Sequence, residues 1–202
     1  MKEIEGFILV GGASSRMGAD KSLLRLGRRT FAEVVAEALR PLAGDVRVVG
    51  SRPSAAGHGL AVVRDVYENL GALGGLHAAL SACGARWAVV VSCDLPFVTA
   101  ELLARLASLR REDCDAVAPV QQDGRPQPLC ALYAAAACRA VAEELIRAGE
   151  LRPRALLRRV RTRWVGFEEL ADLPGSAHFF RNVNTPSDYE EARKLWPAAT
   201  DL

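Results

Sequence analysis

Short apolar runs alternate with amphipathic stretches along most of the chain. The runs are rich in Val, Ile and Leu and end at glycines, small polar residues or prolines, which is typical of buried strands. They cover Gly6–Val10, Val46–Val49, Leu60–Val63, Trp87–Val91, Asp115–Ala118 and Leu129–Tyr133. Strands of a parallel sheet that is covered on both faces are almost continuously hydrophobic, so this pattern predicts a mostly parallel sheet.

Helices are predicted between these strands, because apolar residues recur at helical spacing and are followed by proline or glycine. The predicted helices cover Phe31–Leu39, a segment reaching about Ala82 behind a glycine-rich loop at 71–75, and Ala100 to about Arg110 behind the capping residue Thr99. Strands that alternate with helices predict an α/β fold of three layers, α/β/α. Neither a repeat nor a linker interrupts the pattern, so we expect residues 1–202 to form a single domain.

Composition narrows the class of protein. The 202 residues carry 26 Lys and Arg against 24 Asp and Glu, a net charge of +2 that leaves little excess positive charge for non-specific contact with nucleic acid. No apolar run approaches the ~20 residues that cross a bilayer. Five cysteines without a C-x-x-C pair argue against a disulfide framework or a structural zinc site. The acidic start is not typical of a secretory signal. We expect a cytoplasmic enzyme or small-molecule binder, with neither nucleic acid nor a membrane as partner.

The first predicted strand ends in a glycine-rich loop that carries two cations. Gly11 and Gly12 lack a Cβ, so the backbone can approach a ligand closely and its N–H groups can cradle phosphate oxygens. Arg16 offers a planar fork of donors and Lys21 a compact charge, both suited to a polyphosphate. The spacing matches neither a Walker loop nor G-x-G-x-x-G. The alternative is an ordinary βα turn with two surface cations.

Carboxylates follow two other predicted strands. Asp94 comes after the run Trp87–Val91 and can hold Mg²⁺, a hard ion that is often shared with substrate phosphates. Its alternative role is to cap the next turn. Asp65 follows Leu60–Val63 and by its position alone is a solvated loop acid. Ligands of open parallel sheets lie beyond the carboxyl ends of the strands, so we expect the site there.

Two stretches near the end of the chain also stand out. Asn182 and Asn184 occupy alternate positions, so an extended backbone would point both to one side; the alternative is a turn before the last helix. The stretch Arg147–Arg163 holds seven arginines and only Glu150 as an acid, and it predicts a helix and a short strand with a basic face. There is no G-x-S-x-G elbow, and we interpret Cys93 as a small buried hydrophobe beside the site.

Four motifs taken together resemble the molybdenum cofactor guanylyltransferase family, the MobA-like nucleotidyltransferases. They are L-x-G-G-x-S-x-R-M-G-x-D-K at 9–21, C-D-x-P at 93–96, R-P-Q-P-L-x-A-x-Y at 125–133 and N-x-N-T-P at 182–186. The resemblance runs from about Gly6 to Tyr189. The chain departs from the family pattern at Ser51, where relatives often have Asn, and at Ala72, where they have Pro.

The resemblance implies a Rossmann-like fold of the nucleotide-diphospho-sugar transferase type and a set of site residues. It implies that Asp65 helps to bind guanine and that Asp94 binds both nucleotide and Mg²⁺. The remaining residues that it implies are Leu9, Val10, Gly11, Gly12 and Lys21 for the nucleotide, Arg16, Lys21 and Asp94 for catalysis, and Gln127, Asn182 and Asn184 for the acceptor.

The implied reaction transfers GMP from GTP to the terminal phosphate of Mo-molybdopterin, with Mg²⁺ as cofactor, and gives molybdopterin guanine dinucleotide and pyrophosphate. The stretch Arg147–Arg163 could help to hold the pterin phosphate, or be a solvated helix face. Molybdoenzymes or their chaperones are expected to receive the product. Two alternatives stay open: a cytidylyltransferase or other nucleotidyltransferase of the same superfamily, and a non-catalytic nucleotide-binding partner in cofactor delivery.

Overall fold

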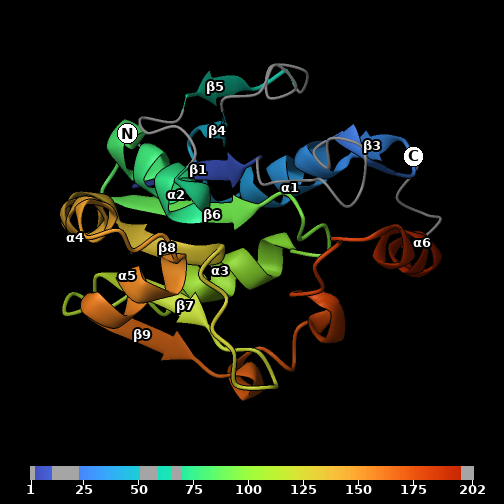
Figure 1. Cartoon of the computed structure of the whole chain (residues 1–202). Coiled ribbons are helices and arrows are strands. Elements are labelled where there is room, and N and C mark those ends of the chain that lie inside the picture. Colours follow the sequence, from blue (N-terminus) through green and yellow to red (C-terminus); the bar gives the residue numbers. More distant parts are fainter. Residues whose placement is uncertain (1–2, 11–22, 51–58, 65–69, 197–202) are drawn as a thin grey trace.

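A seven-stranded sheet lies between two layers of helices (Figure 1). The computed structural model describes residues 3–10, 23–50, 59–64 and 70–196. In spatial order the strands are β5 (Ala61–Val63), β4 (Val46–Val49), β1 (Ile4–Leu9), β6 (Trp87–Ser92), β8 (Cys130–Ala134), β7 (Ala116–Pro119) and β9 (Thr162–Val165). The α/β fold that the sequence predicts is confirmed.

The strand directions bring the carboxyl ends of six strands to one edge of the sheet, and β8 alone among the seven runs the other way. Strands β5, β4, β1 and β6 are parallel, β8 is antiparallel to both of its neighbours, and β9 is parallel to β7. Leu9 at the end of β1 pairs with Val49 of β4 and with Ser92 of β6. The predicted mostly parallel sheet is therefore correct, and β1 and β6 at its centre end level with each other.

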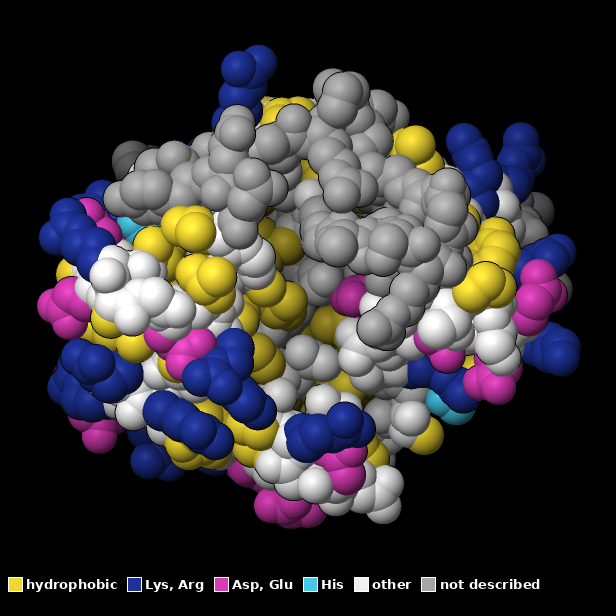
Figure 2. All heavy atoms as spheres, in the orientation of Figure 1, with side chains coloured by type: hydrophobic (Ala, Val, Ile, Leu, Met, Phe, Trp, Pro, Cys, Tyr) yellow, Lys and Arg dark blue, Asp and Glu magenta, His cyan; other side chains and the backbone are white. Residues whose placement is uncertain are grey.

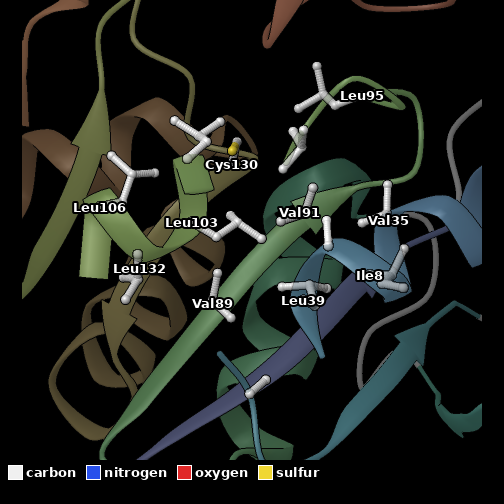
Figure 3. Close-up of a cluster of buried hydrophobic side chains, with 14 of the residues drawn as sticks. Ile8, Val35, Leu39, Val89, Val91, Leu95, Leu103, Leu106, Cys130 and Leu132 are labelled. Carbon is white, nitrogen blue, oxygen red and sulfur yellow. The ribbon is translucent and has the colours of Figure 1, made fainter. Parts of the chain in front are cut away.

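Alternate side chains of the central strands enter two separate cores. Ile8, Val89 and Val91 pack under α1 (Phe31–Leu39) and α3 (Ala100–Ser108), as Figure 3 shows. Phe7 and Val90 point to the other face, which is covered by α2 (Gly71–Ala82), α4 (Ala135–Arg147) and α5 (Pro153–Arg159). Burial of both faces explains why these strands are apolar at nearly every position.

The remaining elements form a third, smaller cluster. The hairpin of β2 (Arg25–Leu26) and β3 (Arg29–Thr30) packs against α6 (Pro186–Leu195) around buried Leu26, Phe31, Val183 and Ala192. Two 3-10 helices, η3 (Phe167–Glu169) and η4 (Ser176–His178), lie between β9 and α6 along the chain. None of the helices in the described ranges has both the length and the apolar character that a membrane span requires.

Most predicted elements are found within a residue or two of their expected bounds. Thr99 caps α3 as predicted, accepting a hydrogen bond from the backbone N of Leu102 at 3.3 Å. The expected glycine loop at 71–75 is wrong, because α2 itself begins at Gly71, whose φ is +59°. Burial of Leu73 and Leu76 beneath the helix offsets the low helix propensity of the glycines beside them. The assignment of residues 1–202 to a single domain stays a prediction.

Candidate active site

Asp94 lies just beyond the carboxyl end of β6, near the middle of the sheet. The backbone N of Cys93 donates to the carbonyl of Leu9 at 3.1 Å, and the N of Leu95 donates to the carbonyl of Ser92 at 3.2 Å. These bonds hold Asp94 in a tight turn between two buried residues, Cys93 and Leu95, which are 5% and 0% exposed. The carboxyl group is half-buried, with its Oδ1 atom enclosed by protein. Cys93 is the small buried hydrophobe that we expected.

The end of β1 meets Asp94 through backbone rather than side chains. Leu9 and Val10 are 6% and 4% exposed, and the N of Val10 donates to the carbonyl of Val49 at 3.0 Å. Their side chains therefore belong to the core, and only their backbone groups can serve a ligand. A Cβ on Gly50 would lie 2.3 Å from the carbonyl oxygen of Val10. Gly50, which the sequence reasoning missed, is thus required where β1 and β4 end.

The structure brings the Asn182–Asn184 segment directly against Asp94. The backbone N of Val183 donates to the carbonyl of Asp94 at 3.0 Å, and the Val183 side chain is fully buried. Asn182 and Asn184 on either side of it are exposed. Both amides therefore lie on the solvent side of the segment, as the alternate spacing predicts.

The alternative, a turn before the last helix, is confirmed only in its capping part: Thr185 is the N-cap of α6, whereas residues 182–184 are in neither a turn nor a helix. The Asp188 carboxylate accepts from the backbone N of Asn184 and from that of Thr185, both at 2.9 Å, and the Thr185 hydroxyl accepts from the N of Asp188. The pKa of Asp188 is lowered, chiefly by the hydrogen bond from Asn184. This capping box fixes the backbone of Asn184 at the start of α6.

Gln127 approaches the same edge from the loop between β7 and β8. Gln127 is 8% exposed, and its backbone N donates to the carbonyl of Pro119 at 2.9 Å. Two residues further on, the carbonyl of Leu129 accepts from the N of Ser92 at 2.8 Å. The loop that carries Gln127 is therefore bonded to the end of β6, two residues before Asp94.

Several of the expected site residues lie outside the residues that the structure describes. They are Gly11, Gly12, Arg16, Lys21 and Asp65. Their roles stay predictions. Leu9, Val10, Asp94, Gln127, Asn182 and Asn184 are described, and backbone hydrogen bonds bring the segments that carry them to one edge of the sheet.

The arginine-rich stretch forms the predicted helix and strand, α5 and β9, and most of its charge is paired. Ion pairs form with acids that mostly lie elsewhere in the chain: Arg147–Glu143, Arg152–Glu150, Arg159–Glu144, Arg161–Asp115 and Arg163–Glu169. Arg154 and Arg158 have no acidic partner within the described ranges and help to line a shallow pocket of about 290 Å³. Figure 2 shows the Lys and Arg side chains gathered on the side where α4 and α5 lie.

The donor set around Asp94 fits Mg²⁺ shared with a substrate. Within the described ranges no three His, Cys, Asp or Glu side chains come together as a metal-binding group. Mg²⁺ is commonly held by one or two carboxylates together with substrate phosphates and water. The half-buried Asp94 carboxylate at the edge of the sheet is suited to that mode.

Comparison with known proteins identifies the family of the chain. A family model described as the MobA-like NTP transferase domain matches residues 6–164. A probable molybdenum cofactor guanylyltransferase from Pelotomaculum thermopropionicum is 39% identical over 198 residues, which is 96% of this chain and 94% of that protein. The molybdopterin-guanine dinucleotide biosynthesis protein A of Archaeoglobus fulgidus is similar with a TM-score of 0.81 and 28% identity, covering 95% and 97% of the two chains.

A more distant likeness shows how widely the fold is shared. The 2-C-methyl-D-erythritol 4-phosphate cytidylyltransferase of Thermus thermophilus has a TM-score of 0.70 at 22% identity, over 96% of this chain and 98% of that one. At this identity the likeness concerns the fold alone. The family model and the Pelotomaculum relative extend over most of the chain, and they confirm the resemblance that the four sequence motifs carry. The chain belongs to the family of MobA-like NTP transferases.

Proposed function

We propose that the protein transfers GMP from GTP to the terminal phosphate of Mo-molybdopterin, giving molybdopterin guanine dinucleotide and pyrophosphate. The observation that carries the proposal is the hydrogen bond between the N of Val183 and the carbonyl of Asp94. It sets a segment with two exposed amides beside a carboxylate at the edge where open α/β sheets bind ligands. The names of the relatives supply the identity of the nucleotide and the acceptor.

The proposed chemistry needs alignment and charge neutralisation more than a base. The terminal phosphate of the acceptor is already an anion at neutral pH, so its oxygen can attack the α-phosphorus of GTP directly. A bond forms between that oxygen and the α-phosphorus, and the bond from the α-phosphorus to the bridging oxygen breaks, so that pyrophosphate leaves with the electron pair. Catalysis by orientation and by fixed positive charge is sufficient for such a transfer.

Each residue has a proposed part in this transfer. Asp94 would hold Mg²⁺ together with the substrate phosphates, and the ion supplies positive charge at the phosphate oxygens when bound. The amides of Asn182 and Asn184, which are exposed on one side of their segment, would donate to the acceptor. Arg16 and Lys21 would hold the triphosphate by charge. This assignment agrees with the lack of a Ser–His or Cys–His pairing in the sequence.

A turnover assay across four nucleotides tests the proposal. Pyrophosphate release is measured with GTP, CTP, ATP or UTP, with Mg²⁺ and with molybdopterin as the acceptor. We expect release with GTP only, and only when both the acceptor and Mg²⁺ are present. Release with CTP would favour the cytidylyltransferase alternative, with which the fold is also compatible. Nucleotide binding without release would favour the non-catalytic alternative.

We also propose a cytoplasmic location and transfer of the product to molybdoenzymes or their chaperones. The cysteines support the location, because all five are free thiols, as is usual in a reducing compartment. Cell fractionation checks the location, and recovery of the cofactor in a co-purified molybdoenzyme checks the transfer. Detection of the chain only in an extracytoplasmic fraction would overturn the first of these.

A further inference from the structure

Helix α6 carries a long-range hydrogen bond that the proposed chemistry does not use. The Tyr189 hydroxyl donates to the backbone carbonyl of Arg25 at 2.8 Å, across 164 positions of the sequence. The Tyr189 ring lies 6.1 Å from the ring of Phe31, centroid to centroid, and the Arg193 guanidinium lies over the Tyr189 ring, 6.0 Å from its centroid. The ring thus packs against its surroundings, while the hydroxyl makes a single directed bond to the β2–β3 hairpin.

The same helix begins at the segment that touches Asp94. The N of Tyr189 donates to the carbonyl of Thr185 at 3.0 Å, one turn before it, where the capping box holds Asn184. Val183 shares a buried cluster with Leu26 of the hairpin and with Phe31, the first residue of α1. A shift of α6 relative to the hairpin would therefore move Val183, and with it the bond to the carbonyl of Asp94.

The far end of α6 lies near the loop that follows Asp94. The ring of Trp196, at the C-cap of α6, lies 6.0 Å from the ring of Phe97, which follows Asp94 by three residues. Val183 before α6 is thus bonded to Asp94 itself, and Trp196 after α6 lies near Phe97, further along the same loop. The Tyr189 hydroxyl joins the helix between these two contacts to the hairpin.

We infer that Tyr189 is a positioning residue: its hydroxyl holds α6 against the β2–β3 hairpin and so keeps the Asn182–Asn184 segment in register with Asp94. The inference rests on the proposed function in assigning Asn182 and Asn184 to the acceptor. It predicts that the hydroxyl affects use of the acceptor and leaves binding of GTP unchanged. If the hydroxyl served stability alone, its removal would destabilise the protein without affecting acceptor use more than GTP binding.

The chain offers a matched control for the substitution Tyr189→Phe. The Thr162 hydroxyl also donates to a backbone carbonyl, that of Leu157, at 2.6 Å, and it lies on the edge strand β9. Thr162→Val deletes this bond with little change of shape. Thr162→Val also removes a longer bond, of 3.5 Å, to the carbonyl of Val160. Each variant therefore loses the hydrogen bonding of one hydroxyl group, in one case on α6 and in the other on the edge strand of the sheet.

Two measurements on the full chain test the inference. In steady-state kinetics, Tyr189→Phe should lower kcat/KM for molybdopterin about fivefold, the effect of one ordinary hydrogen bond, with the Kd of GTP unchanged. In hydrogen exchange, the amides of Val183 and Asn184 should exchange severalfold faster, because both donate in the bonds that the positioning maintains. Thr162→Val should change neither quantity.

The two measurements separate this inference from the proposed function. If the parent protein transfers no nucleotide to molybdopterin, the proposed function fails, and exchange at Val183 and Asn184 still decides whether Tyr189 positions the segment. If Tyr189→Phe leaves exchange of these amides at the parent rate, or changes kcat/KM no more than Thr162→Val does, Tyr189 has no positioning role.

Discussion

The edge of the sheet around Asp94 and the stretch Arg147–Arg163 differ in how their polar groups are used. At the edge, backbone hydrogen bonds join segments distant in sequence, with Cys93 bonded to Leu9 and Val183 bonded to Asp94. In the basic stretch, five of the seven arginines form ion pairs with acids. A high density of charge in the sequence therefore marks a paired surface here, and the convergence of backbone segments marks the site.

The energetics of the two regions explain the contrast. An exposed ion pair contributes about 0.2–1 kcal/mol to stability, and salt screens it further. Such pairs keep the surface of α5 and β9 well hydrated, and because their charges neutralise one another they do not by themselves form a ligand site. A half-buried carboxylate in a turn held by backbone bonds is oriented before any ligand arrives, and preorganised groups are the ones that contribute most to catalysis.

The largest effect is expected from Asp94→Asn. The substitution keeps the shape of the side chain and removes the charged oxygen ligand that Mg²⁺ prefers. Because Asp94 is proposed to serve both the metal and the nucleotide, kcat should fall on the order of 10³-fold. Stopped assays at saturating Mg²⁺ measure kcat of the variant. Thermal unfolding checks that the variant is folded. Near-normal turnover would show that Asp94 only caps the turn and does not take part in catalysis.

A paired test of Lys21 and Arg158 addresses the comparison directly. Loss of a charge that acts mainly in the transition state lowers kcat more than it raises KM. Lys21→Ala should therefore cost about 3 kcal/mol of transition-state stabilisation. Arg158 is exposed at the end of α5, so Arg158→Ala should leave kcat unchanged and at most raise KM for the acceptor. Equal losses of kcat in the two variants would place the phosphate site on the basic stretch.

Asp65→Ala should have a smaller and more selective effect. A carboxylate can accept hydrogen bonds from both N1–H and the exocyclic amine of guanine, whereas adenine offers no such pair of donors. Hydrogen bonds to a charged acceptor contribute about 1.5–3 kcal/mol. Their loss should weaken the binding of GTP by about this amount and leave the binding of ATP nearly unchanged. Calorimetric titration with both nucleotides measures the difference. A parallel loss for ATP would remove the base-reading role from Asp65.

The sequence predicts those parts of the fold and the site that depend on patterns within a few neighbouring residues. Strand β6 is a continuous apolar run, and the exposed Asn182 and Asn184 flank a buried Val183 at the spacing that an extended segment requires. Helix α4 as a whole is missing from the sequence prediction. Its capping position, Ala134, makes no side-chain hydrogen bond, so the run of alanines offers no sign of where the strand ends and the helix begins.

Other features depend on residues that are distant in the sequence. Gly50 is required only because the carbonyl of Val10 approaches it at the ends of two strands. The Tyr189 hydroxyl has a role only because α6 reaches the hairpin at Arg25. The acids that pair with Arg161 and Arg163 are Asp115, just before β7, and Glu169 of η3, and they cannot be assigned from the composition of the basic stretch. Topology, which local patterns do not specify, decides all of these.

The smallest effect is expected from Glu169→Gln, and it concerns stability in acid. The Arg163 guanidinium holds the pKa of Glu169 below its ordinary value of 4.5, with a further hydrogen bond from the backbone N of Gly166. A group whose pKa is lowered by folding stabilises the folded protein above its unfolded pKa, and this contribution is lost as the pH falls through the folded pKa. The parent should therefore be more stable than Glu169→Gln at neutral pH, and the difference should shrink as the pH falls below about 4.5.

Urea unfolding of the two proteins from neutral to acid pH measures this difference. Glutamine retains an oxygen that can accept from Gly166, so the variant isolates the charge on Glu169 from its shape. Turnover at neutral pH should be unchanged, because the pair lies on β9 and η3 and not at the edge that carries Asp94. A constant difference in the free energy of unfolding at every pH would show that Arg163 does not lower the pKa of Glu169. A loss of turnover would show that the ion-paired surface takes part in the reaction, which is the outcome that would remove the contrast between the two regions.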